Sequence, residues 1–593
     1  MIILGVNASH TATACLLVNG EIVACISEER LSRIKSQAGL PILAINEVLK
    51  ISGYKVSEID LLVFGFKDPK VNSCFAALRG TRDEKSDPTS DSSFEKVKKI
   101  SWFLKEELLV RIPFTKNIYN SIMPMFYTFL DKDLQEKLLL AIEQIGIPSE
   151  KVKFVDHHTA HANSAIFSSP QFGKKPLLCL TLDGMGDGFC STVSIVKNKQ
   201  IKLIAKTPQG NSLGDLYSFV TYYLGMRMGE HEYKVMGLAS YTDPKHAEKL
   251  YLRLKELIWV NEDLTFSTNV HSFVFHRILP KILKHERFDN IAAAIQILTE
   301  RLLVEWVEKI VKLTGVHDLV CAGGVFMNVK ANQKILESPM VRSLYVVPSS
   351  GDETTAIGAA YWGYDRLGGE WGNIKPLEHL YLGTNYSNAD ITKEIKKISR
   401  KKYQVEKMDH IEKEVAKLLS KGNVVARFYG SMEFGARALG NRSILADPAN
   451  LDCIREINET IKSRDFWMPF APSILEERQN DYFINPKNYP ANFMTITFVT
   501  TEKGKQDLKA AMHRYDFTLR PQIVRKDVNP SYHRIITEFQ KLTGIGAVLN
   551  TSFNLHGYPI VMSPKDALEV LENSGLKYLA IGDFLIWKKD IID

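Results

Sequence analysis

The chain has 593 residues, a length that predicts roughly two to four domains. Its composition, 45% hydrophobic and 24% charged, is ordinary for a soluble globular protein. A net charge of +7 favours anionic ligands such as phosphates, but it is too small and too dispersed to indicate a nucleic-acid partner.

The basic stretch predicts a helix face, and the cysteines predict a cytoplasmic protein. The densest basic stretch, Lys396–Lys402, is interleaved with isoleucines at helical spacing, which predicts the solvated face of a helix. The seven cysteines form no C-x-x-C pair, which is typical of reduced, buried thiols. The first residues lack the basic region of a signal peptide, and no apolar run reaches about 18 residues, so neither secretion nor a transmembrane helix is expected.

The first predicted elements are three strands. Ile2–Gly5 and Thr13–Val18 are apolar strands, and Glu21–Ser27 is the third. Asn19 and Gly20 lie between the second and third strands and both tolerate positive φ, which predicts a tight hairpin turn.

A second strand–loop–hairpin unit follows later in the chain. Pro176–Leu182 predicts a strand, Asp183–Gly188 a glycine-rich loop, and Ser191–Val196 and Ile201–Ile204 a hairpin. Two such units suggest a duplicated architecture, and the glycines would let backbone N–H groups approach an anion closely. Two ordinary hairpins in a mixed sheet remain the alternative.

The middle of the chain contains a predicted insertion, a long helix and a glycine turn. The polar stretch Lys67–Lys99 predicts a long surface loop, and Ile291–Leu313 has the apolar stripe of a helix. The strand Asp318–Cys321 runs into a double glycine at 323–324 and a helix from about Asn328, an arrangement that predicts a nucleotide or phosphate site.

A stretch rich in glycine, tryptophan and proline, Leu367–Pro376, predicts a domain boundary. The residues beyond it have helices, strands and glycine loops of their own. We therefore expect an N-terminal α/β domain at residues 1–370 and a separate C-terminal α/β domain at residues 380–593.

Two short segments contain candidate metal ligands. On a helix, His157 and His161 are one turn apart, so both imidazoles could reach one zinc, iron or nickel ion. Asp352 and Glu353 form an acidic turn before a helix of small residues, where a carboxylate could complete the site or lie near phosphates. A polar helix face for the histidines and an N-cap for the aspartate are the open alternatives.

The densest group of basic residues lies in the second half. The segment Gly430–Ser443 places Arg437 and Arg442 among glycines, and guanidinium groups match phosphate or carboxylate geometry. Lys462 and Arg464 follow, and further polar segments run through His513–Gln522 and Asn550–Asn554. The pattern favours a polyanionic ligand over a network of structural salt bridges. Neither a Walker A lysine loop nor a G-x-S-x-G elbow is present.

Taken together, these motifs resemble the O-carbamoyltransferase family of nodulation protein U and the cephamycin and tobramycin carbamoyltransferases. The matching segments run almost end to end in family order: Gly5–His10, Glu28–Arg30 with Arg33 and Lys35, His157 with His161, Asp183–Asp187, Tyr233–Ala239, Gly323–Asn328, Gly351–Asp352, Ala356–Ala360, Met432–Pro448, Pro469–Pro472, Arg520–Gln522 and Asn550–Asn554.

The resemblance implies an α/β protein with two linked sites. The N-terminal domain would have the duplicated, ribonuclease H-like fold of actin and Hsp70, and the C-terminal domain would resemble threonylcarbamoyl-adenylate synthase. The C-terminal site would make carbamoyladenylate from carbamoyl phosphate and ATP, which is bound with Mg²⁺. The N-terminal site would pass the carbamoyl group to a hydroxyl of a small metabolite, as in the tailoring of natural products, with the help of a divalent metal, most often iron.

The resemblance also assigns roles to individual residues. It implies a metal site formed by His157, His161, Asp183 and Asp352, of which the two histidines and Asp352 also take part in catalysis. It implies that adenylate is bound in the N-terminal domain by Gly323, Gly324 and Asn328. It implies that carbamoyl phosphate and ATP are bound by Arg437, Arg442, Lys462, Arg520, Asn550 and Ser552.

The chain departs from the family pattern at three positions. Thr11 replaces a frequent Asp, Ala436 replaces the usual Pro before Arg437, and Met468 replaces an Arg that would add a cation to the carbamoyl phosphate pocket. Other enzymes of related fold are the alternatives: a tRNA-modifying threonylcarbamoyl-type transferase, a transferase onto a thiol for hydrogenase metal-ligand synthesis, and an actin-like sugar kinase or ATPase. The acceptor stays open, and residues 67–150 are expected to contribute to its pocket.

Overall fold

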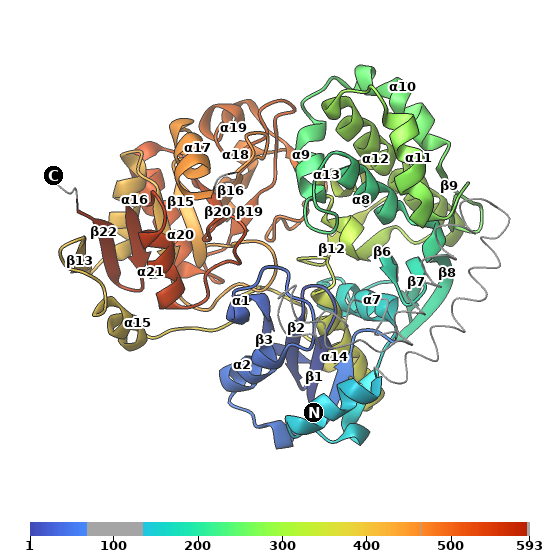
Figure 1. Cartoon of the computed structure of the whole chain (residues 1–593), viewed down its shortest axis with the longest axis horizontal. Helices are drawn as coiled ribbons and strands as arrows, with labels where there is room; N and C mark the ends of the chain where they lie inside the picture. The colour runs from blue at the N-terminus through green and yellow to red at the C-terminus, as the bar shows by residue number, and fades with distance from the viewer. Residues whose placement is uncertain (68–134, 463, 590–593) are drawn as a thin grey trace, which may run out of the picture. The chain divides into compact units, whose positions relative to one another are not determined.

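The computed structural model describes residues 1–67, 135–462 and 464–589 (Figure 1). They form two compact units. Unit 1 consists of Met1–Glu21, Ala38–Ile42 and Tyr54–Pro376, and unit 2 of Ile22–Gln37, Leu43–Gly53 and Leu377–Asp593. Two short segments near the N-terminus therefore group with the second half of the chain. Apart from Lys67, the surface loop predicted at 67–99 lies outside the described residues.

The first sheet has five strands: β1 (Ile2–Asn7), β2 (Thr13–Val18), β3 (Glu21–Ser27), β4 (Leu61–Phe64) and β5 (Val152–Phe154). Their order is β3-β2-β1-β4-β5, with β1 antiparallel to β2 and parallel to β4, and β4 parallel to β5. Asn19 and Gly20 have φ values of 50° and 90°, which confirms the predicted tight turn between β2 and β3.

The second sheet belongs to unit 1 and repeats this topology. Its strands are β6 (Leu177–Gly186), β7 (Phe189–Lys197), β8 (Gln200–Pro208), β11 (Asp318–Ala322) and β12 (Ser343–Val346), in the order β12-β11-β6-β7-β8. Strands β6, β7 and β8 pair antiparallel with one another. On the other side, β6 pairs parallel with β11, and β11 pairs parallel with β12. The two sheets thus confirm the predicted duplicated, ribonuclease H-like fold of actin and Hsp70.

The glycine-rich segment after Leu182 differs from the prediction. Residues Asp183–Gly186 remain in β6 and pair with β7 after an irregularity between Leu182 and Gly186. The loop predicted over 183–188 is therefore wrong for its first four positions. The irregularity matters for the site, because it begins at Asp183, a residue of the expected metal set.

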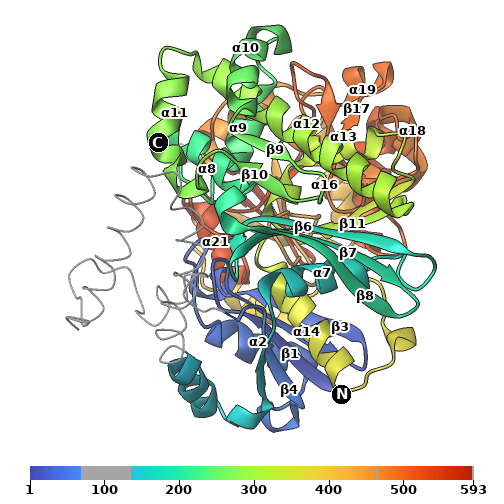
Figure 2. The same ribbon diagram turned by 90° about the vertical axis from the view of Figure 1, so that its right-hand side faces the viewer.

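Two helices lie between the sheets, α7 (His157–Ser168) and α14 (Thr354–Arg366) (Figure 2). A Cβ atom on Gly358 of α14 would lie 1.7 Å from the carbonyl oxygen of Ala160 in α7. A Cβ on Gly5 of β1 would lie 1.9 Å from the carbonyl oxygen of Ala356. Small residues thus let α14 pack directly on α7 and on the first sheet.

Further helices follow β8 in unit 1: α8 (Leu213–Tyr223), α9 (Glu232–Ala239), α10 (Pro244–Lys255), α11 (Phe275–Leu283), α12 (Phe288–Thr314) and α13 (Val329–Glu337). The long predicted helix is confirmed by α12, and the helix predicted from about Asn328 by α13, for which Asn328 is the N-cap. In the described part of the chain, no helix has the length and hydropathy needed to cross a membrane, and six cysteines are buried free thiols.

Unit 2 is built on an eight-stranded mixed sheet in the order β13-β22-β21-β14-β15-β20-β16-β19. The strands are β13 (Tyr403–Lys407), β14 (Val425–Phe428), β15 (Arg442–Ala446), β16 (Ala471–Leu475), β19 (Gln522–Val524), β20 (Ala547–Ser552), β21 (Tyr578–Ile581) and β22 (Phe584–Lys588). Val425 faces one hydrophobic core and Ala426 the other, so the sheet separates two cores. The unit is α/β, as predicted, and its likeness to threonylcarbamoyl-adenylate synthase stays a prediction.

Helices α16 (Ile411–Ser420) and α20 (Pro530–Thr543) supply one of these cores, and α21 (Pro564–Glu572) the other. The basic stretch Lys396–Lys402 is not the face of a helix as predicted. Helix α15 (Asn388–Ile395) ends just before it.

Candidate active site

The N-terminus of α7 presents three buried histidines. The Asp156 side chain caps the helix by accepting from the backbone N–H of Thr159 at 3.0 Å. His157 and His161 follow on one face, with ring centroids 4.6 Å apart. His158 turns instead toward Thr181, whose hydroxyl lies 2.8 Å from its Nδ1.

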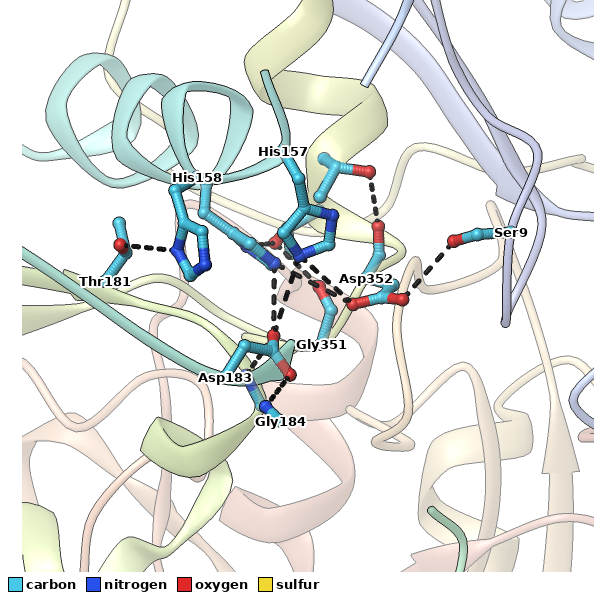
Figure 3. A network of polar contacts seen from close by, with 12 residues as sticks. Ser9, His157, His158, Thr181, Asp183, Gly184, Gly351 and Asp352 are labelled. Atoms are coloured by element: carbon cyan, nitrogen blue, oxygen red, sulfur yellow. Dashed lines mark hydrogen bonds and ion pairs between the residues drawn. The ribbon is translucent and has the colours of Figure 1, made fainter. Parts of the chain in front are cut away.

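Two carboxylates, Asp183 and Asp352, face the paired imidazoles, of which Figure 3 labels His157. Asp183 comes from the irregular end of β6, and Asp352 from the turn before α14. The His161 Nε2 atom lies 3.2 Å from an Asp183 oxygen and 3.8 Å from an Asp352 oxygen. The corresponding distances from His157 Nε2 are 4.0 and 3.8 Å. The structure therefore brings together all four residues of the expected metal set, from three separate elements.

This group fits a divalent metal. One ligand atom from each residue lies within 4.8 Å of all the others. Donors bound at about 2.1 Å would be separated by roughly 3.0–4.2 Å, depending on the angle between them. Within the described part of the chain, the Nε2 atoms of both histidines are buried and have no hydrogen-bond partner. Two neutral imidazoles and two carboxylates suit iron(II), zinc or manganese.

Surrounding groups fix the orientation of both carboxylates. Asp183 accepts from the backbone N–H groups of Gly184 at 2.6 Å and Gly324 at 2.9 Å. Asp352 accepts from the hydroxyl of Ser9 at 3.3 Å. Such outer contacts hold ligands in place and tune the metal they bind.

Burial and neighbouring charges shift the pKa values of the histidines and of Asp183. Burial disfavours the charged form of His161, but the nearby carboxylates of Asp183 and Asp352 outweigh it and raise the pKa to about 9. Burial also opposes ionisation of Asp183, yet His161 holds the pKa of that carboxyl far below its usual range. Burial and the neighbouring histidines lower the pKa of His158 to about 4. The two carboxylates thus favour a cation beside them. A bound metal ion would take the place of the proton on His161.

The residues predicted to hold adenylate have roles inside the protein. Gly323 has φ of 104°, and a Cβ there would lie 2.3 Å from the carbonyl oxygen of Leu182, so only glycine fits. Gly324 supplies the N–H that holds Asp183. The Asn328 side chain caps α13 and exchanges hydrogen bonds with Gln296 at 2.9 and 3.0 Å.

Unit 2 contains a second cluster of predicted residues. The Lys462 ammonium donates to the Ser552 hydroxyl at 2.8 Å and to the Asn554 side-chain oxygen at 2.7 Å. Burial, with the like charges of Arg464 and Lys35, lowers the pKa of Lys462 well below its usual value. Burial and the charges of Arg437 and Arg464 do the same to the pKa of Arg520. Because these buried cations also repel one another, the cluster is a candidate anion site.

Two other predicted residues in unit 2 bind the protein backbone. The guanidinium of Arg442 is completely buried and donates to the carbonyls of Tyr429 at 2.8 Å and Gly430 at 3.1 Å. Its carbon lies 3.7 Å from the ring centroid of Phe428. The Asn550 amide donates to the carbonyl of Ala438 at 3.0 Å. Both therefore shape the loop around Arg437.

The structure also adds residues that sequence reasoning did not assign. Glu433 is buried, and one of its oxygens accepts from the backbone N–H groups of Leu439, Asn441 and Arg442. Its signal in the sequence was a lone acidic residue inside the arginine-rich glycine segment. At the departure Thr11, the hydroxyl lies 3.2 Å from an oxygen of buried Glu353.

Comparisons with known proteins extend over both units. The model for the carbamoyltransferase N-terminus matches residues 2–361, and that for the carbamoyltransferase C-terminus matches residues 416–588. An uncharacterized protein (MJ1058) of Methanocaldococcus jannaschii is 33% identical and covers 96% of both chains. Another (sll1178), from Synechocystis, is 32% identical and covers 99% of this chain and 96% of its own.

A named relative is nodulation protein NolNO of Sinorhizobium fredii, 30% identical over 98% of this chain and 79% of its own. Among solved structures, HypF of T. kodakarensis aligns with 63% of this chain and 49% of its own at 13% identity, with a TM-score of only 0.31. The family models cover most of the sequence in the expected order. The chain therefore belongs to the carbamoyltransferase family and is an enzyme that transfers carbamoyl groups.

Proposed function

We propose that this protein is an ATP-dependent O-carbamoyltransferase that acts on a hydroxyl of a small metabolite. Residues 380–593 would form carbamoyladenylate from carbamoyl phosphate and ATP, and residues 1–370 would transfer the carbamoyl group. The observation that carries the proposal is the cluster of His157, His161, Asp183 and Asp352 in a carbamoyltransferase N-terminal region. The cationic cluster in unit 2 supports the adenylation step.

The first half-reaction needs anion binding. Hydrolysis of carbamoyl phosphate releases phosphate and leaves carbamate, whose oxygen attacks the α-phosphorus of ATP and displaces pyrophosphate. Arg437, Lys462 and Arg520 would bind the phosphate groups, whose negative charge would offset the burial of the Lys462 and Arg520 cations. Mg²⁺ would accompany the nucleotide.

In the second half-reaction, the acceptor oxygen attacks the carbamoyl carbon and gives up its proton to a basic group of the site, and AMP leaves with the bonding electrons. A bound divalent metal, for which we propose iron, would supply Lewis-acid stabilisation of the charge that develops on oxygen. Asp183 and Asp352 would hold it with the two histidines, while Gly324 and Ser9 keep the carboxylates oriented. The six buried free thiols support a reducing, cytoplasmic location.

The adenylation step can be tested without knowing the acceptor. The full-length protein is incubated with ATP, Mg²⁺ and carbamoyl phosphate, and pyrophosphate and carbamoyladenylate are followed by mass spectrometry. We expect both products, and Arg437→Ala should reduce their formation by at least about 100-fold because a charge-assisted phosphate contact is lost. Arg455→Ala is the matched control, because Arg455 lies exposed on α17 (Asp452–Glu456), paired with Glu459. Failure of the wild-type protein to release pyrophosphate would rule out the adenylation route.

A further inference from the structure

The loop that carries Arg437 is held by side chains on its C-terminal side. Within residues 433–442, Glu433 accepts from three backbone N–H groups at 2.8 to 3.1 Å. The loop carbonyls are bonded in turn, Ala438 by Asn550 at 3.0 Å, Leu439 by Gln522 at 2.8 Å and Gly440 by Arg427 at 2.6 Å. This side of the loop is therefore preorganised.

The N-terminal side of the loop is held by a residue from the beginning of the chain. The Arg30 guanidinium donates to the carbonyl oxygen of Gly435 at 2.7 Å. The side chain is only 5% exposed, and its other terminal nitrogen lies 3.1 Å from an oxygen of Glu29. Glu29 thus balances the charge of Arg30, and the remaining terminal nitrogen of Arg30 bonds the loop backbone. Both Arg30 and Gly435 belong to unit 2.

Arg437 lies between these two anchors. Gly435 has φ of 90°, a conformation that glycine adopts without strain. Ala436 is exposed and stands where the resembled family has proline. The φ angle of residue 436 is therefore not restricted by a proline ring. The position of the Arg437 backbone therefore depends on hydrogen bonds on either side of it. Arg30 bonds the carbonyl of Gly435, and Asn550 bonds the carbonyl of Ala438.

We propose that Arg30 is a positioning residue of the anion site, which sets the place of Arg437 by fixing the carbonyl of Gly435. The inference rests on the proposed function, in which Arg437 binds a phosphate group of carbamoyl phosphate or ATP. On this proposal, the segment Ile22–Gln37, which the sequence places in the predicted N-terminal domain, supplies a positioning residue of the adenylate-forming site. Arg30 itself makes no contact with substrate in this arrangement.

Three full-length variants test the role of Arg30. Arg30→Met removes the hydrogen bond, Arg30→Lys retains one donor, and Glu28→Gln is the control. Glu28 belongs to the same segment and accepts from the backbone N–H groups of Leu43 and Ala44, at the start of α2 (Ile42–Ser52) and away from the loop. The measurements are KM and kcat for carbamoyl phosphate at saturating ATP, by pyrophosphate release, and the Kd for inorganic pyrophosphate by calorimetry.

We expect Arg30→Met to raise KM and the pyrophosphate Kd by about tenfold with a smaller change in kcat, because binding suffers before chemistry. Arg30→Lys should raise both by about threefold, and it carries the test if Arg30→Met does not fold. Glu28→Gln should lower Tm and leave KM unchanged. Wild-type KM and Kd in the Arg30 variants would overturn the proposal, as would an equal rise in Glu28→Gln. If the wild-type protein released no pyrophosphate but bound it in an Arg30-dependent manner, the adenylation reaction would fail and the role of Arg30 would stand.

Discussion

Asp183 links the candidate metal centre to the backbone of two neighbouring turns. One of its oxygens accepts from Gly184, and the other accepts from Gly324 and faces His161. The carboxylate is therefore fixed in rotation before any metal binds. A fixed ligand loses little conformational entropy on metal binding, which favours affinity.

Replacement of Asp183 by Asn should abolish stoichiometric metal binding. The amide keeps the size of the side chain but loses the negative charge that a divalent ion needs, so affinity should fall by at least about 100-fold. Metal content after anaerobic reconstitution with iron(II), and the Kd from titration, are the readouts. Asp156→Asn is the control, since asparagine caps a helix as well as aspartate does. Equal metal content in Asp183→Asn and the wild-type protein would exclude Asp183 as a ligand.

A buried carboxylate far from the site makes stability depend on pH. Asp318 begins β11 and forms ion pairs with Lys175 at 2.6 Å and with Arg342. Burial opposes its ionisation, but these donors and Ser343 lower its pKa to about 2. The folded-state pKa is depressed, so the ion pairs stabilise the fold above the unfolded pKa near 4 and are lost as pH falls through 2.

Asp318→Asn should therefore destabilise unit 1 by about 2 kcal/mol at pH 7. The difference from the wild-type protein should shrink progressively between about pH 4 and pH 2 as the native carboxylate is protonated. Urea denaturation monitored across this range measures it. A difference that did not vary with pH would show that shape, rather than charge, accounts for the loss.

Residue spacing predicted part of the site and family resemblance the remainder. The i, i+4 spacing of His157 and His161 was enough to place both imidazoles on one helix face. No local pattern connected them to Asp183 or Asp352, because those contacts arise from three elements that meet only in the fold. Sequence reasoning also could not distinguish an arginine that binds a ligand from one that binds carbonyls, as Arg442 does.

At the scale of elements, strands bounded by clear turns were predictable. The turns after β2 and between β7 and β8 place non-glycine residues at positive φ, which asparagine tolerates. The extension of β6 through Asp183–Gly186 was not predictable, because glycines weaken strand propensity locally while pairing with β7 holds the backbone extended. The end of α15 was missed because the isoleucine spacing continues past Ile395, although the helix does not.

The contact between α7 and α14 gives an element-scale prediction. A Cβ at Gly358 would overlap the carbonyl oxygen of Ala160, which belongs to backbone and cannot rotate away. Gly358→Ala should cost about 3 kcal/mol and weaken metal binding, because α7 carries both histidines and α14 follows Asp352. Thermal unfolding and metal titration check both effects. Gly372→Ala is the control, since a Cβ there meets no atom within 4 Å, and similar Tm values for the two variants would contradict the packing argument.

At the scale of the whole molecule, the repeated strand order explains why two hairpin units recur in one sequence. In each of the two five-stranded sheets, the central strand pairs antiparallel with the strand that follows it in the chain and parallel with the strand on its other side. The grouping of Ile22–Gln37 with the second half was beyond reach of sequence reasoning, because its contacts there, such as the hydrogen bond from Arg30 to Gly435, join residues as far as 405 positions apart. Contiguous segments are the default reading of a sequence, and this chain departs from it.

The central claim is that the two chemical steps use separate sets of residues. The most direct test compares the wild-type protein with Arg437→Ala and Asp183→Asn, each given ATP, Mg²⁺ and ¹³C-labelled carbamoyl phosphate without acceptor. The account predicts labelled carbamoyladenylate from the wild-type protein and from Asp183→Asn, and none above background from Arg437→Ala. The account would be contradicted if Arg437→Ala formed carbamoyladenylate at the wild-type rate. It would also be contradicted if Asp183→Asn formed none while Arg437→Ala still did.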